Sequence, residues 1–429
     1  MLLITLDTTR ADRLGCYGYG GGTSPNLDRL AAAGVVFERA MAQAAVTPVS
    51  HASILTGLNP YRHGLRVMHG LARNRLGDGQ VTLAEVLEGA GYATAGFVSA
   101  FPASRRFGLG QGFETFDDDF GHTNANQLVT DRGIVNTGRV QRTAKDTTDR
   151  ALAWLRARGD GSFFLWVHYF DPHDPQLLPP PEYLMQFNVP DEVMADTPQR
   201  LRAIYDIELR YMDLHIGRLI DALQQAGRFE ETVTVVVADH GEGLGDHNWW
   251  THGILYQEQI RVPLLVKAPG VKPGRRVASV VRTLDIMPTV LELAGVGRKD
   301  WPAMEGVSLA GVLTGSTPVP KLAAYADSVN KLTYTFAEGL TDNKDEMLFA
   351  LLDWPFKFIY HREHPSRSEL YDLSADPGEL RNLLTDQPAR GKRMIDLLAQ
   401  RDFLPADSPE AARMSEAEVE KLKSLGYVK

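Results

Sequence analysis

The chain has a single cysteine, Cys16, among 429 residues. One cysteine excludes an intrachain disulfide and any metal site built from several thiolates. The sequence also lacks an apolar run of 18 or more residues, so no membrane-spanning helix is expected. No secretory leader is recognisable, although Met1 lies directly on the first predicted strand. The chain as written is therefore expected in the cytoplasm, or in the periplasm or outside the cell if a leader has been removed.

Basic charge is also in short supply. Lys and Arg number 45 against 54 Asp and Glu, which gives a formal net charge of −9. An acidic chain without a Lys/Arg block is a poor general binder of nucleic acid, so a nucleic-acid partner is not expected. The hydrophobic content of 44% is ample for a large core at this length. We expect one large domain and a smaller one, in an oligomeric state that the sequence does not define.

Apolar strands alternate with helical patterns over residues 1–300, which is typical of α/β proteins with a large, mainly parallel sheet sandwiched by helices. The expected strands are Leu2–Leu6, Ala95–Ser99, Phe163–Tyr169, Thr232–Ala238 and Val262–Lys267. The expected helices are Pro25–Ala33, Thr82–Ala90, Thr147–Arg158, Leu201–Ala226 and Asp285–Ala294. A proline-rich surface loop is expected over Leu177–Pro190.

The pattern changes after about Leu309, which predicts a catalytic domain over residues 1–309 and a smaller C-terminal α+β subdomain over 310–429. Short strands are expected at Leu322–Ala326, Met347–Leu352 and Phe356–His361, followed by helices near Pro388–Arg401 and Ser415–Leu425.

Two acids follow buried strands at widely separated places. Asp239 and His240 come directly after a valine run, and Asp7 comes directly after the first strand. By itself the Asp-His pair is equally consistent with a capped turn. If the two strands are neighbours, however, both carboxylates lie at one edge of the sheet, where they repel each other unless a cation lies between them. Asp and His donors suit a divalent metal.

A third segment, Thr47 to Gly57, places hydroxyl residues ahead of an apolar helix. A helix N-terminus favours an oxyanion and an anionic substrate, although an ordinary Thr or Ser cap has the same appearance. His51 could hydrogen-bond an alkoxide or a leaving group, or it could be a surface histidine.

With these segments in order, the chain resembles the sulfatase family of the alkaline phosphatase superfamily over nearly its whole length. The resemblance is carried by seven segments: Leu6–Arg13, Ser24–Phe37, Ser50–Gly57, Phe170–Pro175, Ala238–Glu242, Tyr256–Pro263 and Glu369–Glu379.

The resemblance implies an alkaline phosphatase-like fold and a metal held by Asp7, Asp239, His240 and the nucleophile's oxygen, with Thr47 at the nucleophile position. His173 and His252 match positions that contact the substrate's anionic group or protonate its leaving oxygen. Arg10 and Asp171 are further candidates for substrate binding, and Asp171, His173 and His252 could supply a second metal site. One divalent ion, Mn²⁺, Mg²⁺, Ca²⁺ or Zn²⁺, is the primary expectation.

The chain departs from the family in ways that bear on its substrate. Sulfatases oxidise a Cys or Ser to formylglycine, whereas the methyl group of Thr47 would allow only a ketone, so no formylglycine is expected. A phosphorylated threonine can be hydrolysed by metal-activated water, whereas a sulfated threonine has no easy breakdown path. Thr8 replaces the second family aspartate, and His51 replaces the motif's arginine.

We therefore expect a metal-dependent hydrolase or transferase acting on phosphate esters, such as phosphodiesters or phosphonate monoesters, through a covalent phospho-Thr47. The expected substrate is a small anionic ester. Two alternatives stay open at this point: a sulfatase acting on sulfate esters, and a catalytically inactive member that binds metal.

Overall fold

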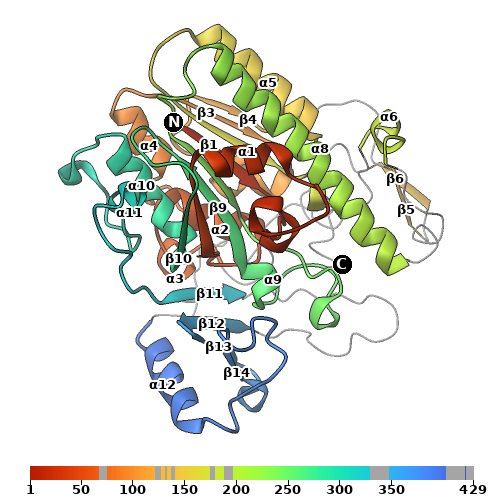
Figure 1. Ribbon diagram of the computed structural model, residues 1–429, viewed down its shortest axis with the longest axis vertical. Coiled ribbons are helices and arrows are strands. Elements are labelled where there is room, and N and C mark those ends of the chain that lie inside the picture. The colour runs from red at the N-terminus through yellow and green to blue at the C-terminus, as the bar shows by residue number, and fades with distance from the viewer. Residues whose placement is uncertain are drawn as a thin grey trace.

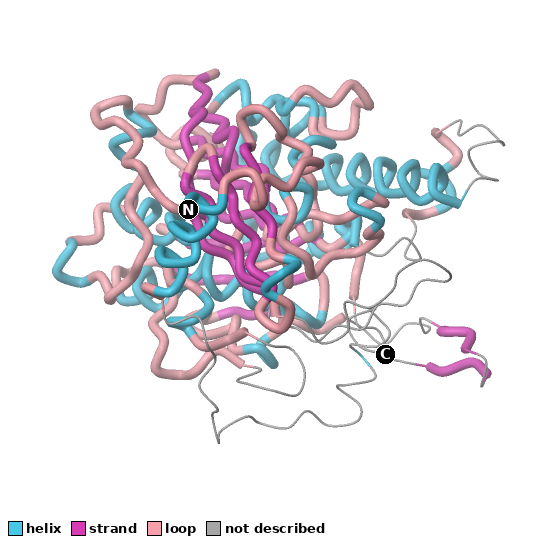
Figure 2. Tube along the Cα trace, turned by 90° about the horizontal axis from the view of Figure 1, so that it is seen from below, coloured by secondary structure: helices cyan, strands magenta, loops and turns pink. Residues whose placement is uncertain are grey.

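A computed structural model covers the whole chain and describes residues 1–66, 75–120, 127–130, 133–136, 141–173, 179–187, 197–328, 347–401 and 421. Its centre is an eight-stranded sheet that runs through the middle of the molecule with helices on both sides (Figures 1 and 2). The strand order is β10-β2-β9-β8-β1-β7-β3-β4. The bounds are β1 Leu2–Leu6, β2 Val35–Met41, β3 Ala93–Val98, β4 Thr115–Asp117, β7 Phe163–Tyr169, β8 Thr234–Ala238, β9 Arg261–Lys267 and β10 Arg275–Arg282.

The sheet is mainly parallel, as the alternation of strands and helices predicts. Only β9 runs against its two neighbours, β8 and β2. Two successive reversals bring β2 back to the direction of β1 and β8, so all three strands end at the same edge of the sheet. The strand β1 lies at the centre, with every one of its residues buried between β7 and β8. Burial on both faces explains its continuous apolar sequence.

Two groups of helices cover the sheet. In the first, α8 packs against both α1 and α5, and in the second α2, α4 and α10 pack against one another. Local sequence sets their ends: Pro25 begins α1, Thr82 caps α4 with a reciprocal bond to Glu85, and Gly57 ends α2 with a φ of +66°. The bounds are α1 Pro25–Ala33, α2 Thr47–Thr56, α3 Pro60–His63, α4 Leu83–Gly89, α5 Ala144–Arg158, α6 Pro181–Leu184, α8 Thr197–Gln225, α9 Gln257–Ile260, α10 Ile286–Leu293 and α11 Ala310–Thr314.

A four-stranded antiparallel sheet forms a smaller unit below the large sheet (Figure 1). Its order is β11-β12-β13-β14, with bounds Ala324–Ser328, Leu348–Asp353, Phe356–His361 and Glu369–Asp372, and α12 spans Pro388–Ala399. One face shares a core with the large unit, where Met41 and Ile260 pack with Ala326 and Ile359. The helix α11 packs on α10, and the small sheet begins with β11 at Ala324, while the domain boundary expected at residue 309 stays a prediction.

The sequence-based element boundaries hold to within a few residues for the large elements, but some elements were missed. Val35–Met41 and Arg275–Arg282 form strands that were not predicted, and both contain charged residues that interrupt the apolar pattern. Within the loop expected over 177–190, the described residues include α6. The helix expected over Ser415–Leu425 lies almost wholly outside the described residues. The short strands β5 Gln127–Thr130 and β6 Gly133–Asn136 pair with each other.

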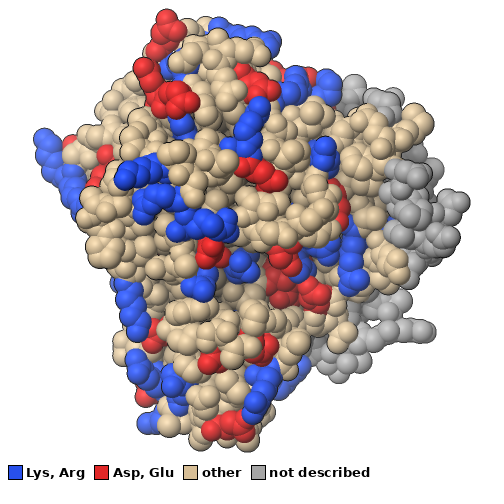
Figure 3. Space-filling model, in the orientation of Figure 1, with Lys and Arg blue, Asp and Glu red and all other residues tan. Residues whose placement is uncertain are grey.

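Lys and Arg side chains are interspersed with Asp and Glu over the face shown in Figure 3. None of the described helices is both long enough and apolar enough to cross a bilayer.

Candidate active site and metal centre

Three neighbouring parallel strands deliver the acidic residues of the site to one edge of the sheet. Leu6 pairs with Ala238 on one side and with Tyr169 on the other, so Asp7 and Asp239 begin side by side. Their backbones continue the pairing, since Asp7 N donates to Tyr169 O at 2.8 Å and Asp239 N donates to Leu6 O at 3.2 Å. The expectation that these acids meet at the carboxyl ends of adjacent strands is confirmed.

Thr47 reaches the same edge from β2, as the first residue of α2. Its hydroxyl oxygen lies 3.2 Å from Asp7 Oδ2 and 3.4 Å from His240 Nε2. The other hydroxyl of the motif is used differently, because Ser50 Oγ donates to the backbone oxygen of Asp239 at 2.7 Å. Of the two hydroxyls, it is therefore that of threonine that lies among the acidic and histidine side chains.

His240 presents one defined nitrogen to this group. Its Nδ1 lies 3.0 Å from Gly241 O, and because a carbonyl oxygen can only accept, Nδ1 carries the hydrogen. The lone pair is then on Nε2, the atom that faces Thr47. This is the tautomer in which a histidine binds a metal ion through Nε2.

The donor set fits a divalent metal ion. One ligand atom each from Asp7, Asp239 and His240 lie within 4.8 Å of one another, and all three residues are buried. Asp7 Oδ1 accepts no hydrogen bond although it is buried. Burial raises the pKa of Asp7 well above its ordinary value, the charge of Asp239 raises it further, and burial likewise raises the pKa of Asp239. A cation between the two carboxylates would compensate both effects.

Thr8 adopts a strained backbone beside this group. Its φ is +46°, in the left-handed region that a β-branched residue rarely occupies. The turn directs the Thr8 N–H to Asp239 Oδ1 at 3.2 Å, and the Tyr205 hydroxyl donates to Thr8 O at 2.7 Å. Tyr205 also accepts from the backbone N–H of Arg10 at 2.9 Å. The Tyr205 side chain, which comes from α8, therefore holds the turn after β1 by two hydrogen bonds.

His51 is fully buried, which rules out a surface histidine. Its Nδ1 donates to Thr47 O at 2.8 Å, and its Nε2 lies 2.9 Å from Thr5 Oγ1. Burial lowers the pKa of His51 to about 4, so the ring is neutral near pH 7. The expectation that His51 meets an alkoxide or leaving group is not supported by these contacts, which connect the ring to the Thr47 backbone. Its Nδ1 also lies 3.5 Å from Asp239 Oδ2.

The sequence motifs do not include His168, yet it contacts the site directly. Ser99 N donates to its Nδ1 at 3.3 Å, so Nε2 carries the hydrogen and donates to Asp7 Oδ2 at 3.1 Å. Burial lowers the pKa of His168 well below its ordinary value. Its position in β7, paired with Thr5 of β1, is the signal that could have identified it, since alternate residues of a strand share a face.

His252 and His173 lie next to Asp7, Asp239 and His240, the three residues able to hold a metal, which are called the metal-ligand group below. The ring centroid of His252 is 4.6 Å from that of His240 and 5.0 Å from that of His173. His173 stacks on Phe170 at 4.1 Å and is 9% exposed, the most accessible of these histidines. The expectation that both histidines serve the reacting ester is consistent with these positions and stays a prediction.

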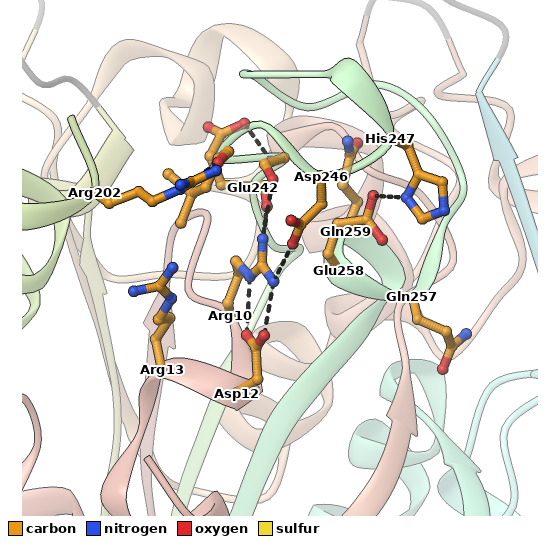
Figure 4. Close-up of polar contacts among 12 residues, drawn as sticks. Arg10, Asp12, Arg13, Arg202, Glu242, Asp246, His247, Gln257, Glu258 and Gln259 are labelled. Atoms are coloured by element: carbon orange, nitrogen blue, oxygen red, sulfur yellow. Dashed lines mark hydrogen bonds and ion pairs between the residues drawn. The ribbon is translucent and has the colours of Figure 1, made fainter. Parts of the chain in front are cut away.

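Two residues expected to bind substrate are engaged elsewhere. All five N–H groups of Arg10 are used, by the carboxylates of Asp12 and Asp246 and by the backbone oxygens of Glu242 and Gly243. These contacts leave Arg10 without a donor for a substrate and correct its expected role. Figure 4 shows Arg10 between these groups.

Asp171 contacts the start of a helix. Its Oδ1 accepts from Ala144 N, at the first turn of α5, at 2.8 Å. Its expected role in substrate binding therefore finds no support in these contacts. In the described part of the chain, one group of three His, Cys, Asp or Glu residues is compact enough to hold a metal ion, namely Asp7, Asp239 and His240. The alternative second metal site at Asp171, His173 and His252 is accordingly not assembled.

Family models match both units of the chain. The sulfatase model matches residues 1–296, and the model described as N-sulphoglucosamine sulphohydrolase, C-terminal, matches residues 245–401. The chain belongs to the sulfatase family. The resemblance inferred from the motifs is therefore confirmed, and so is the fold. Members of this family bind a divalent metal, and the Asp7, Asp239 and His240 group is able to hold one.

Known proteins similar to this sulfatase-family chain span nearly its full length. It is 27% identical over 471 residues to an arylsulfatase of Clostridium perfringens, covering 93% of this chain and 92% of that one. A solved putative sulfatase of Bacteroides thetaiotaomicron has a TM-score of 0.74 at 22% identity, covering 94% and 92%. A phosphonate monoester hydrolase of Silicibacter pomeroyi has a TM-score of 0.72 at 24% identity, covering 97% and 99%.

Proposed function

We propose that this member of the sulfatase family hydrolyses phosphate diesters or phosphonate monoesters, with the unmodified hydroxyl of Thr47 as nucleophile. The observation that carries the proposal is the position of Thr47 Oγ1, 3.2 Å from Asp7 Oδ2 and 3.4 Å from His240 Nε2. The hydroxyl lies among the atoms that would hold a divalent metal, at the N-terminus of α2, where the helix dipole favours negative charge.

Asp7, Asp239, His240 and Thr47 are the residues that would hold the metal ion. When bound, such an ion lowers the pKa of a coordinated hydroxyl and withdraws charge from an ester oxygen. Mixed oxygen and nitrogen donors of this kind accept Mn²⁺, Mg²⁺, Ca²⁺ or Zn²⁺.

The protein's own residues then account for the two displacements. The Thr47 hydroxyl passes its proton to Asp7 Oδ2 while its oxygen attacks phosphorus. The bond from phosphorus to Thr47 forms as the bond to the leaving oxygen breaks, and His252 or His173 protonates that leaving oxygen. Water then attacks phosphorus and gives a proton to the histidine that lost one. The bond from phosphorus to Thr47 breaks, and the Thr47 oxygen takes its proton back from Asp7. An acceptor alcohol in place of water would make the reaction a transfer.

The side chain at position 47 favours phosphorus over sulfur. Threonine carries a methyl group on Cβ, so oxidation cannot give the aldehyde from which formylglycine chemistry proceeds. A phosphorylated threonine retains a direct route to hydrolysis by in-line attack of water. The second candidate function is sulfate-ester hydrolysis by the unmodified hydroxyl, which is favoured by the arylsulfatase name of a relative that matches over nearly the whole chain.

The test compares four ester classes on the metal-loaded protein: aryl sulfate, phosphate monoester, phosphodiester and phosphonate monoester. We expect the highest kcat/KM on the phosphodiester or the phosphonate, and a phosphoryl group on the peptide that contains Thr47 after acid quench. A preference for aryl sulfate would select the second candidate. No turnover on any ester by protein with a full complement of metal would select an inactive metal-binding member.

The matched variants are Thr47→Ala and Thr47→Ser. Thr47→Ala removes the nucleophile, and we expect turnover to fall by about 100-fold or more, whereas Thr47→Ser keeps a hydroxyl and should keep measurable turnover. Metal content and the circular dichroism spectrum are compared for all three proteins. Undiminished turnover in Thr47→Ala would reject Thr47 as nucleophile.

A further inference from the structure

We propose that Glu242 is a positioning residue for His252 and that Arg10 in turn positions Glu242. The inference rests on the proposed function, in which His252 is one of two histidines that could protonate the leaving oxygen, and it assigns that task to His252.

The carboxylate of Glu242 sets the hydrogen of the His252 ring. Glu242 Oε2 lies 3.2 Å from His252 Nδ1, and its Oε1 accepts from Gly243 N at 3.1 Å. Glu242 is 6% exposed and His252 is 1% exposed, so both groups are shielded from water. A carboxylate oxygen accepts a hydrogen bond, so this contact places the Nδ1 hydrogen towards Glu242 and directs Nε2 to the opposite side of the ring.

The ring held in this way lies among the other histidines of the site. Its centroid is 4.6 Å from that of His240, a metal-ligand residue, and 5.0 Å from that of His173. A proton donor must lie within hydrogen-bond reach of the leaving oxygen. A small rotation of the His252 ring would therefore lower the rate of proton transfer more than the affinity for the substrate.

Arg10 fixes the backbone that carries Glu242. Its Nη1 donates to Glu242 O at 3.2 Å and to Gly243 O at 3.0 Å, while Nη2 donates to Asp246 Oδ2 at 2.7 Å. The preceding Gly241 allows this close approach, because a Cβ there would lie 2.0 Å from Glu258 O and 3.3 Å from Arg10 Cγ. The segment 241–246 therefore packs against the buried guanidinium of Arg10, whose five N–H groups all donate hydrogen bonds (Figure 4).

The chain offers a matched control in a second Glu–His pair. Glu258 Oε1 lies 2.8 Å from His247 Nδ1, and the exposed fractions of the two glutamate side chains alone are 7% for Glu258 and 8% for Glu242. His247 stacks on Tyr256 at 3.8 Å. The control pair has the same chemistry and a glutamate of similar burial. Its histidine is more exposed, at 15% against 2%, and contacts Tyr256 rather than the metal-ligand group.

The experiment measures how kcat/KM depends on the leaving group, using one ester class with alcohols that range from 4-nitrophenol to an alkanol. The ester class is the one the wild-type protein hydrolyses fastest. A good leaving group needs no proton, whereas a poor one does. For Glu242→Ala we expect kcat/KM to fall about 10- to 100-fold more for the alkyl ester than for the 4-nitrophenyl ester, with metal affinity unchanged.

Two further variants separate positioning from a general structural role. Glu242→Gln keeps an oxygen that accepts from Nδ1 and should recover most of the alkyl-ester activity. Arg10→Lys cannot make five hydrogen bonds and should share the leaving-group dependence of Glu242→Ala. Glu258→Ala should lower activity equally, or not at all, for every leaving group.

Loss of activity by the same factor on all leaving groups in Glu242→Ala would overturn the inference, and so would no loss on any of them. The same selective loss in Glu258→Ala would overturn it as well. Failure of the proposed function is distinguishable, because it appears as undiminished turnover in Thr47→Ala or as a preference for aryl sulfate, whatever the leaving-group dependence.

Discussion

His168 Nε2 donates to Asp7 Oδ2 at 3.1 Å, across the neighbouring strands β7 and β1. The same carboxylate oxygen accepts from Thr47, while Asp7 Oδ1 accepts no hydrogen bond. One oxygen of Asp7 is thus used for orientation and the other is left for a cation. Groups that orient a ligand in this way commonly matter for metal affinity nearly as much as the ligand itself.

Removal of His168 should therefore weaken metal binding. We expect His168→Ala to lower metal affinity about 10- to 100-fold, measured by competition with a chelator of known affinity. His215→Ala is the control, because His215 is also a buried histidine but lies on α8 and contacts Arg218. Equal affinity in His168→Ala and wild type would show that His168 does not orient Asp7 for the metal.

Removal of the metal should destabilise the protein, because two buried carboxylates remain close together. We expect chelation to lower the melting temperature of the wild type. Asp7→Asn removes one of the two charges, so its metal-free form should be more stable than the metal-free wild type by about 1–3 kcal/mol, although it binds metal less tightly. Chemical denaturation in chelator measures both proteins, and a less stable metal-free Asp7→Asn would contradict the repulsion argument.

Asp171 should make the stability depend on pH in a defined direction. Burial raises the pKa of Asp171 to about 7, from an ordinary value of 3.8. The folded state therefore holds the proton more tightly than the unfolded state, and the stability contributed by that proton is fully present below pH 3.8 and lost as the pH rises to about 7. Over some three pH units the loss is at most about 4 kcal/mol.

Asp171→Asn is the comparison for this effect, since its amide oxygen can still accept from Ala144 N but does not titrate. The stability of wild type relative to Asp171→Asn should fall between pH 5 and pH 7.5, as measured by denaturation with urea. A difference that is constant across this range would be contrary to a raised pKa.

A buried ion pair should matter for the small sheet. Lys357 Nζ and Glu379 Oε1 are 2.7 Å apart with neither side chain exposed, and Glu379 Oε2 accepts from Gln257 N of α9 at 2.6 Å. Lys357→Met leaves Glu379 as an unpaired buried charge, which should cost about 3–5 kcal/mol in the free energy of unfolding. Adding Glu379→Gln should recover part of that cost, as tested by urea denaturation of the single and double variants.

Much of the fold and of the metal centre could be predicted from the sequence because strand ends carry the chemistry. The valine run before Asp239 and the apolar strand before Asp7 predict two strands of one sheet, and adjacent parallel strands bring their ends together. Thr47 and His240 followed from the same logic and from the family resemblance. Local pattern was enough here because Asp7 and Asp239 directly follow strands and Thr47 begins a helix.

The contacts between distant side chains could not be predicted in the same way. Arg10 is engaged by Asp246, 236 residues away, and nothing near Arg10 in the sequence indicates that pairing. Burial of His51 and the use of Asp171 by α5 likewise depend on packing between elements that are far apart in the chain. Arg275–Arg282 was missed as a strand because its edge position permits charged residues.

The central place of β1 has a consequence for biosynthesis. The strand β1 finds its partners only when residues 163–169 and 234–238 have been made, so its second edge stays unpaired until β8 has been translated. Until then an apolar pentapeptide with unpaired edges is open to chaperones or to neighbouring nascent chains. Slow translation upstream of residue 234 should therefore lower the yield of native protein.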